Sequence, residues 1–555
     1  MLGKNLFGYF YRLALLLLFL LPVGCHPDDK PETPVAPKAY FDLLDALDAD
    51  LELQTIARQG TSTHLVFSDG STLDIPLEEL FIYDCTESDP APVRVDPATG
   101  TWKVGDKDTG ITRSEEVLPR NCVPVYAWFT WASVSWIISN GETLTIRGES
   151  ATGKYRLPVV RITTDGGQVI ADKINYVPGT IVFEDPDGLY SDVPLQECRM
   201  GIRGRGNTTW GFEKKPWRVK LDEKQSVMGF HKDKNYALLA NYSDKTLLRN
   251  MVAMELSRIL GFSWTPHMVS VEVFLNDEYQ GCYTLSEHKQ VASHKVDIKV
   301  VDPETVEGEA LTGGYYIEID GSQDEPFCFW TGVGIPVMLS EPEQPNDAQK
   351  AYLKQLFKDF EDALYSEDFK DPDKGYAHYI DVDSFVKFFI LQELAKNVDG
   401  NLRKSTFLTK EQGGKLEMYH VWDFDIAFGN CNYFPDFWPG TTNTYEGWFV
   451  KDYINYSYKC DGWYGRLFKD PAFVEKVRAC WNQHKEEFLG IPDFIDENVR
   501  LLGKAPARNF ERWKILGKKV WPNVVAPGTY SGEIDYLKEF YLNRLNWMDQ
   551  ALAAL

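Results

Sequence analysis

The chain contains the stretch Asn397-Val398-Asp399-Gly400-Asn401 and, further on, the stretch Trp422-Asp423-Phe424-Asp425. Between them, Ser405–Leu408 and Leu416–Val421 are rich in β-branched, aromatic and alternating residues. The segment Glu411–Gly414, which separates these two runs, has the composition of a turn. The pattern therefore predicts a β-hairpin between the two acidic stretches.

The predicted hairpin would bring acidic residues together. Paired strands lie about 4.8 Å apart, so Asp399, just before the first strand, is expected to approach Asp423, just after the second. Asp425 adds a third carboxylate. Neighbouring acids repel unless a cation separates them, and Mg²⁺ or Mn²⁺ prefers such oxygen ligands. The alternative is that Asp399 and Gly400 form a simple turn and that the other acids lie on the surface.

A helix is predicted upstream of the first acidic stretch. Asp383 is expected to cap it, and the apolar residues Phe385, Phe388, Phe389 and Leu394 have helical spacing. The order is helix, acidic loop, hairpin and acidic pair. Protein kinases place their catalytic loop and metal-binding segment in the same order. The His-Arg-Asp and Asp-Phe-Gly signatures of those kinases are absent here.

A basic, glycine-rich segment supports a phosphate-binding role. It runs from Arg203 to Trp210, and a second basic run, Lys214–Leu221, follows it. Glycine lets a backbone approach a ligand closely, and Arg and Lys bring positive charge to phosphate. The segment is neither a P-loop nor a complete dinucleotide-binding fingerprint. A glycine-rich turn whose Arg203 and Arg205 pair with surface acids is the alternative.

Taken together, these segments resemble the CotH kinase family, the spore-coat protein H type of atypical protein kinase. The resemblance covers nearly all of the chain from about Leu157 to the C-terminus. Several motifs occur in the order of the family, which makes a chance match unlikely. The motifs are Ile202–Trp210, Lys215–Leu221, Leu248–Asn250, Asn276–Tyr283 continuing into Leu285–Glu287, Gly313–Tyr315, Asn397–Asn401 and Trp422–Asp425.

The resemblance implies an α+β fold. The expected catalytic domain is atypical protein-kinase-like and two-lobed, with a small nucleotide-covering lobe and a helical lobe. The implied cofactors are ATP and Mg²⁺ or Mn²⁺, and the implied reaction is transfer of the ATP γ-phosphoryl group to Ser or Thr of a substrate protein.

Motif by motif, the resemblance assigns roles to the acidic stretches. Asp399 is similar to the catalytic acid, and Lys404 occupies a place where a positive charge would steady the transferred phosphoryl group. Asp423 is similar to the metal-binding acid, and Asp425 is a second candidate metal ligand.

One departure from the family pattern affects the metal site. After the lysine the family usually has Asn, a natural second metal ligand, whereas this chain has Ser405. The hydroxyl of Ser405 is a weaker ligand, and Asn401 offers another amide oxygen. The number of bound metal ions and the activity itself depend on this substitution.

The resemblance also assigns a nucleotide site. The turn residues Arg203, Gly204, Arg205, Gly206 and Asn207 are expected to cover the phosphates.

The strands around that turn offer further candidates for the nucleotide site. Either Lys215 or Lys220 is expected to reach the phosphates from the next strand. Glu287, at the end of a predicted strand, is expected either to meet the adenine or to brace the fold.

The N-terminus predicts export. Lys4 and Arg12 flank a short apolar run, Leu13–Leu21, which is too short to span a bilayer and is typical of a signal peptide. Leu21-Pro22-Val23-Gly24-Cys25 is similar to a bacterial lipobox, with Pro22 in place of the preferred aliphatic residue. Cys25 would become the lipidated first residue. The acidic His26–Lys30 is similar to the surface-export tags of Bacteroidetes-type lipoproteins. These features predict an exported protein, lipid-anchored in the outer membrane and displayed at the cell surface.

Changes in composition and the positions of turn residues predict four segments. They are a lipoprotein signal peptide (1–24), a tether (25–39), a small β-rich accessory module (40–150) and a CotH kinase-like domain (155–555). Hairpin patterns predict the β module: Thr63–Phe67 with Thr72–Ile75, and Trp128–Ile138 with Thr143–Ile146. Aromatic residues of this module are candidates for binding a surface glycan, although aromatic residues in small β domains ordinarily form the core.

Composition is that of an exported globular protein. The chain has 555 residues, 44% of them hydrophobic, a formal net charge of -24 and nine cysteines. The strong negative charge argues against a nucleic-acid partner. No Cys-x-x-Cys pair occurs, so a zinc site is not predicted.

The main rival function is a non-catalytic surface lipoprotein that uses the kinase-like fold for adhesion or glycan binding. ATP is scarce outside the cytoplasm, which favours this rival. The joint presence of Asp399, Asp423 and the Arg/Gly turn favours the enzyme. A third reading is metal-dependent phosphoester hydrolysis with the same carboxylates and a water acceptor.

Overall fold

The computed structural model describes two units of the chain, Met1–Ala151 and Thr152–Leu555, which are treated separately. The described residues are 53–59, 62–67, 70–76, 93–95, 101–104, 107–112, 124–129, 133–138, 143–147, 149–150, 157–185, 188–191, 195–432, 445–452, 454–455 and 460–555. The predicted signal peptide, the tether and Cys25 lie outside them.

The described part of the first unit consists of short strands in three small sheets. Their orders are β10-β1-β2-β3, β4-β5-β6 and β7-β8-β9. The predicted hairpin of β2 and β3 is confirmed. The predicted strand 128–138 is two strands, because β7 ends at Phe129 and β8 begins at Ser133. The bounds are β1 Leu53–Gln59, β2 Ser62–Phe67, β3 Thr72–Pro76, β4 Val93–Val95, β5 Thr101–Val104, β6 Lys107–Thr112, β7 Pro124–Phe129, β8 Ser133–Ile138, β9 Thr143–Arg147 and β10 Glu149–Ser150.

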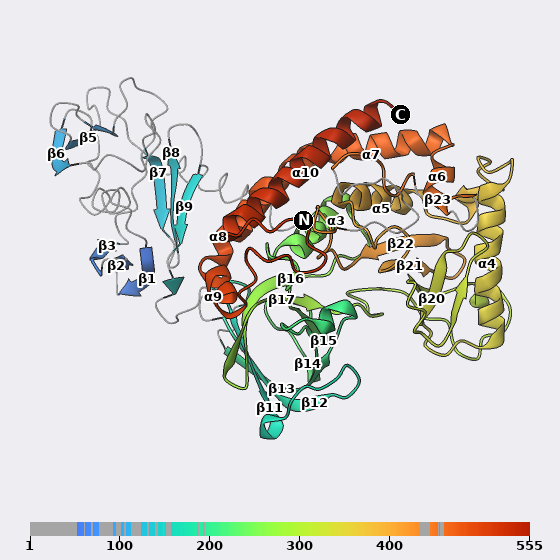
Figure 1. The fold of residues 1–555 in the computed structure, drawn as a ribbon, viewed down its shortest axis with the longest axis horizontal. Helices are drawn as coiled ribbons and strands as arrows, with labels where there is room; N and C mark the ends of the chain where they lie inside the picture. Colours follow the sequence, from blue (N-terminus) through green and yellow to red (C-terminus); the bar gives the residue numbers. More distant parts are fainter. Residues whose placement is uncertain are drawn as a thin grey trace, which may run out of the picture. The chain divides into compact units, whose positions relative to one another are not determined.

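The second unit begins with a closed barrel of seven strands in the order β11-β12-β13-β14-β15-β17-β16. The parallel pairing of β11 with β16 closes it, and the other pairs are antiparallel. Figure 1 shows these strands below the long helices α7 and α10. The bounds are β11 Val159–Thr164, β12 Val177–Glu184, β13 Leu195–Gly204, β14 Trp217–Gln225, β15 Asp233–Leu239, β16 Met268–Leu275 and β17 Glu278–Glu287.

Alternating side chains explain why these segments form a barrel. In β14, Trp217, Val219 and Leu221 are buried and belong to the barrel core, while Lys220 is exposed and Arg218 is partly exposed. A period of two places one set of side chains inside and the other outside. The outer face of the barrel therefore carries the basic side chains of this strand.

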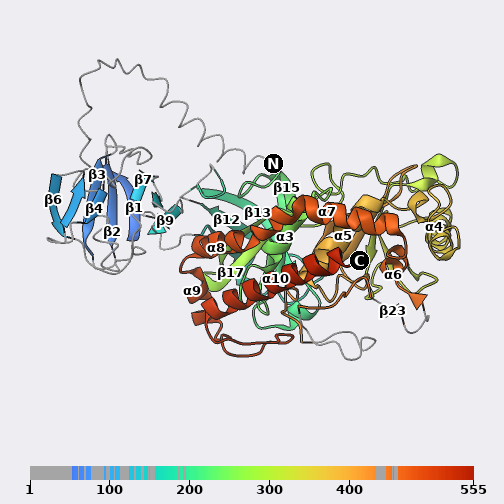
Figure 2. The ribbon, with the colours of Figure 1, turned by 90° about the horizontal axis from the view of Figure 1, so that it is seen from above.

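The rest of the second unit combines a five-stranded sheet with helices. The sheet order is β19-β20-β18-β21-β22, and α4 flanks it in Figure 1. Figure 2 shows the long helix α10 beside α7 and α5, with which it is in contact. The strands are β18 Tyr315–Ile319, β19 Cys328–Trp330, β20 Pro336–Glu341, β21 Thr406–Lys410, β22 Leu416–Val421, β23 Ile454–Asn455 and β24 Cys460–Asp461. The helices are α3 Arg249–Leu260, α4 Asp347–Tyr365, α5 Val382–Ala395, α6 Trp463–Leu467, α7 Pro471–Leu489, α8 Ile491–Leu502, α9 Ala505–Arg512 and α10 Tyr530–Ala553.

The predicted helix before the acidic loop is α5. It lies in the large core of this part, with Phe385, Phe388 and Phe389 buried. The predicted cap was wrong: the side chain of Asp381 accepts from Ser384 N at 2.7 Å, whereas Asp383 lies in the first turn and pairs with Lys476 at 2.6 Å. An N-cap must stand just outside the helix to reach the free backbone N–H groups of its first turn.

The predicted α+β class is confirmed by the mixture of strands and helices. The barrel has its own core, and a second core spans the five-stranded sheet and the helices. Within the part of the chain that the structure describes, no helix combines the length and the apolar character that crossing a membrane would require.

Candidate active site

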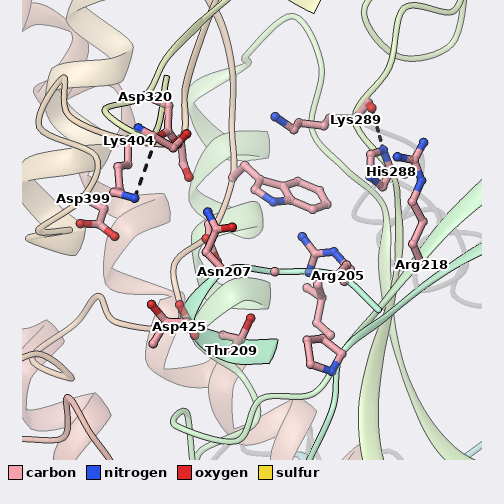
Figure 3. Close-up of a pocket in the computed structure, with 18 of the residues that line it drawn as sticks. Arg205, Asn207, Thr209, Arg218, His288, Lys289, Asp320, Asp399, Lys404 and Asp425 are labelled. Atoms are coloured by element: carbon pink, nitrogen blue, oxygen red, sulfur yellow. Dashed lines mark hydrogen bonds and ion pairs between the residues drawn. The ribbon is translucent and has the colours of Figure 1, made fainter. Parts of the chain in front are cut away.

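A cavity of about 1220 Å³ collects most of the residues that the sequence singled out. Its walls come from the glycine-rich turn after β13, the connector after β17, strand β18, and the loops before β21 and after β22. Figure 3 shows Asp399, Lys404 and Asp320 on one side of it, with Arg205, Arg218 and His288 across from them. Acidic and basic groups thus face each other across the cavity.

The hairpin of β21 and β22 delivers two of the acids, as its pattern predicted. Thr406 pairs with Val421, so the residues just outside this pair, Ser405 and Trp422, lie at the open end of the hairpin. Asp399 and Asp423 both line the cavity. Burial raises the pKa of Asp399, and the negative charge of Asp423 raises it further, against the opposing effects of Arg403 and Lys404.

The turn after β22 is held in a special backbone conformation. Asp423 has φ 69°, a left-handed conformation that few residues other than Gly, Asn and Asp adopt readily. The side chain of Asn250 accepts from Phe424 N at 2.8 Å, and Asn430 Nδ2 donates to Asp425 O at 2.7 Å. These bonds hold the backbone that carries both carboxylates.

Asp423 and Asp425 lie close enough to affect each other. Burial raises the pKa of Asp425 well above its ordinary value, and the charges of Asp423, Asp244 and Asp399 add to that rise. Burial also raises the pKa of Asp423, while Arg205 and Lys289 oppose the rise. The side chain of Asp423 itself is exposed toward the cavity, whereas that of Asp425 is partly buried. A cation would relieve this repulsion.

The donor groups fit a divalent cation that is shared with a phosphate ligand. Mg²⁺ is commonly bound by one or two carboxylates together with substrate phosphates, and Asp423 and Asp425 supply the carboxylates. Among the described residues, no group of three or more acidic, His or Cys side chains forms a complete metal cage. Ser405 lines the cavity. Asn401 is buried outside the cavity lining, and its Nδ2 donates to Phe449 O at 3.3 Å.

The glycine-rich turn lines the opposite wall, with Arg203, Gly204, Arg205, Gly206 and Asn207 all facing the cavity. Gly206 has φ 80°, and a Cβ there would collide with Thr209 Oγ1. Only glycine fits this position without strain.

The two arginines of this turn have different surroundings. The guanidinium of Arg205 lies 5.8 Å from the ring centroid of Trp422. Its charge also acts on Asp423 and Asp425. Arg203 instead donates to Lys173 O and stacks over Tyr176. Arg205 therefore faces the acids, and Arg203 fastens the turn to the neighbouring loop.

The structure does not bring the two predicted lysines into the cavity. Lys215 Nζ donates to Trp210 O at 2.8 Å, and Lys220 is exposed on β14; neither lines the cavity. Arg218, two residues before Lys220 on the same face, does. Lys214 also reaches the cavity, but its Nζ donates to Cys282 O and to Asn509 Oδ1, and burial lowers its pKa to about 7.

Glu287 also lies outside the cavity lining. It is buried at the end of β17, where its Oε2 accepts from His267 N at 2.9 Å. The sequence left two roles open for Glu287, contact with the adenine or bracing of the fold. The contact with His267 N suits the second role.

The cavity residues that were not identified from the sequence include His288, Lys289, Glu318 and Asp320. Lys289 forms an ion pair with Glu318, and Lys404 Nζ lies 3.9 Å from Asp320 Oδ1. Two features of the sequence could have pointed to these residues. His288 and Lys289 directly follow the Leu285–Glu287 motif, and Glu318 and Asp320 stand two residues apart shortly after the Gly313–Tyr315 motif.

Comparison with protein families gives a match. A sequence model of the family described as CotH kinase protein matches residues 202–548, more than half of the chain. The match includes every cavity segment from the glycine-rich turn to Pro522. No curated protein matches the chain.

Proposed function

The chain belongs to the CotH kinase family, and from that premise we propose that it transfers the γ-phosphoryl group of ATP to a Ser or Thr hydroxyl of a protein. One observation carries the proposal: Asp399, Lys404, Asp423 and the basic glycine-rich turn line a single cavity. In this proposal the barrel acts as the nucleotide-covering lobe, and the part built from the five-stranded sheet and the helices acts as the second lobe.

The residues divide the chemistry between them. The acceptor hydroxyl oxygen forms a bond to the γ-phosphorus, the bond from that phosphorus to the β,γ-bridging oxygen breaks, and ADP leaves. Asp399 orients the acceptor hydroxyl and takes its proton. Lys404, held near Asp320, offsets negative charge on the phosphoryl group in transit.

The turn and the acidic pair bind the nucleotide. The Gly204–Asn207 backbone approaches the phosphates, and Arg205 contributes positive charge. Asp423 and Asp425 would hold Mg²⁺ or Mn²⁺, which neutralises phosphate charge. Because Ser405 replaces the usual Asn, these two carboxylates would be the main protein ligands of the metal ion.

The proposed location follows from the N-terminal sequence. Cleavage before Cys25 and lipidation of that residue would anchor the protein in the outer membrane, with the catalytic unit exported and displayed at the cell surface. A substrate protein is the proposed partner, and the source of ATP would then be outside the cytoplasm.

The test is label transfer from γ-labelled ATP with Mg²⁺ or Mn²⁺, using a chain that lacks residues 1–25. Asp399→Asn should lower the transfer rate by about 10²–10⁴-fold while ATP binding persists. Asp423→Asn should abolish metal-dependent ATP binding, because Asn keeps the left-handed backbone conformation but loses the charge.

Lys220→Met serves as the control, since Lys220 is exposed outside the cavity. It should leave both transfer and ATP binding unchanged. If the wild-type chain neither transfers label nor binds ATP with metal, the kinase proposal fails. The non-catalytic adhesion or glycan-binding scaffold then becomes the preferred account.

A further inference from the structure

Lys289 is held in the cavity by two neighbouring elements. It follows β17 by two residues, and its Nζ forms an ion pair with Glu318 Oε2 on β18. The same Nζ lies 4.2 Å from the ring centroid of Phe407 on β21. A carboxylate and an aromatic face together fix a lysine ammonium that would otherwise sample many positions.

The pair is shielded from solvent but still faces the cavity. The side chain of Lys289 is 25% exposed and that of Glu318 is 9% exposed, and both residues line the cavity. A purely structural ion pair needs no access to a ligand. Here part of the Lys289 side chain stays exposed, and the residue lines the cavity that the acids and the glycine-rich turn also line.

Lys289 shares the cavity with the proposed metal-binding acid. Both Lys289 and Asp423 line it, and Glu318 holds the Lys289 ammonium there. A phosphate group bound to a metal ion at Asp423 would therefore lie in the same cavity as that ammonium, where opposite charges attract.

The other described lysines of the cavity are engaged elsewhere. Lys214 donates to Cys282 O and Asn509 Oδ1, and Lys404 lies beside Asp320 near the catalytic acid. Lys173 is at the rim, where it donates to Asn207 Oδ1 at 3.4 Å. Among the described lysines that line the cavity, Lys289 is left as the candidate for the bound phosphates.

We propose that Lys289 is the phosphate-binding lysine of this cavity and that Glu318 is its positioning residue. The ligand class is the di- or triphosphate of a nucleotide, so the inference rests on the proposed function. Glu318 lies on β18, and Asp320 directly follows that strand. Glu318 then holds Lys289, which binds the phosphates of the nucleotide. Asp320 holds Lys404, which acts on the phosphoryl group in transit.

The experiment measures binding of Mg²⁺-ATP and of adenosine by calorimetry, on the chain lacking residues 1–25. Lys289→Met should weaken ATP binding about 10- to 100-fold, the range for a lost hydrogen bond to a charged group. Adenosine binding should be unchanged, because adenosine has no phosphate. Lys215→Met is the matched control and should change neither affinity, since Lys215 lies outside the cavity lining.

Glu318→Gln tests positioning through a double-mutant comparison. Alone it should weaken ATP binding by several-fold, and in the Lys289→Met background it should add nothing. A merely structural role for Glu318 would lower the melting temperature equally in both backgrounds and leave the ratio of ATP to adenosine affinity constant. Such a constant ratio would overturn the positioning role.

Two failures are distinguishable. A wild-type chain that binds no ATP overturns both the proposed function and this inference. A wild-type chain that binds ATP, together with Lys289→Met at wild-type affinity, overturns the inference alone. If Lys289→Met does not fold, Lys289→Arg keeps the charge and replaces it in the comparison with adenosine. An Arg variant with wild-type folding should retain part of the preference for ATP, and complete loss of that preference would contradict the assignment.

Discussion

Two residues at the open end of the hairpin adopt left-handed backbone conformations, Ser405 with φ 49° and Asp423 with φ 69°. Such conformations cost free energy for residues other than glycine, and they persist where the surroundings impose them. Both residues line the cavity. The backbone strain therefore coincides with two of the residues that the family resemblance assigned to the metal site.

The glycine-rich turn allows a sharp test at the residue scale. Gly206→Ala places a Cβ against Thr209 Oγ1 at a backbone position with φ 80°. The strain should cost about 1–2 kcal/mol. We expect the turn to shift and ATP affinity to fall about tenfold in calorimetry.

Gly211→Ala is the control for this substitution. It lies in the same connection, and a Cβ there would meet nothing within 4 Å. The control should leave ATP affinity unchanged. Equal affinities for the two variants would contradict the view that the turn must keep its shape to bind ATP.

At the scale of elements, Asp233 fastens β15 to the connector after β17. Its carboxylate accepts from Lys295 Nζ at 2.6 Å and from Gln290 Nε2 at 2.8 Å. Burial alone would raise the pKa of Asp233, but these bonds and that from Lys234 N outweigh burial and lower it from 3.8 to about 2. The connector is the segment that carries His288 and Lys289 into the cavity.

This depressed pKa predicts a pH dependence of stability. A lowered pKa in the folded state stabilises the protein above the unfolded pKa, and the stabilisation is lost as pH falls from about 4 through about 2. The shift corresponds to about 2 kcal/mol. Asp233→Asn should therefore lower the free energy of unfolding by about that amount at pH 7. Denaturant titrations should show the difference from wild type narrowing below pH 4, and a difference independent of pH would contradict this account.

Helix α9 is fastened to the barrel by two ion pairs in different surroundings. Arg508 binds Glu272 through two hydrogen bonds of 2.9 and 2.6 Å, and the Glu272 side chain is fully buried. Arg508→Met leaves a buried carboxylate without this partner and should cost about 3 kcal/mol in denaturant unfolding.

Arg512→Met is the matched control on the same helix. Arg512 pairs with Glu278, whose side chain is 61% exposed, so its loss should change stability by less than about 1 kcal/mol. Equal losses for the two variants would show that α9 is not held by the buried pair.

Local patterns in the sequence predicted the elements of the acidic site better than those of the basic site. The hairpin and α5 depend on short-range signals, namely alternation, turn composition and helical spacing. Asp399 and Asp423 line the same cavity because the loop before β21 and the turn after β22 lie at the same end of the hairpin, which also follows from local order. The geometry of a hairpin depends on residues that are close together in the sequence, so a local pattern is enough to predict it.

The choice among basic residues could not be predicted in the same way. Arg218 and Lys220 share one face of β14, and only the packing of the barrel against the rest of the unit decides that Arg218 meets the cavity. Lys289 acquires its place from Glu318 and Phe407, which come from strands that follow it in the sequence. Contacts of this kind depend on tertiary structure, and a single sequence carries no pattern for them.

At the scale of the whole molecule, the cavity belongs to the second unit. The described residues that line it run from Lys173 to Pro522, all within Thr152–Leu555. A chain that begins at Thr152 should therefore bind ATP with the affinity of the chain that begins at His26. Calorimetry on both chains tests this, with the melting temperature of the second unit as a check on folding. A tenfold loss in the shorter chain would assign the first unit a part in nucleotide binding.

The closed barrel also limits how another polypeptide can attach. An open sheet offers unpaired backbone groups along its outermost strand, and an incoming extended peptide can join the sheet there. The pairing of β11 with β16 leaves no such strand in the barrel. Any acceptor protein that approaches the barrel side of the cavity must therefore be recognised through side chains and loop tips, which discriminate by sequence, and not by extending the sheet, which accepts almost any sequence.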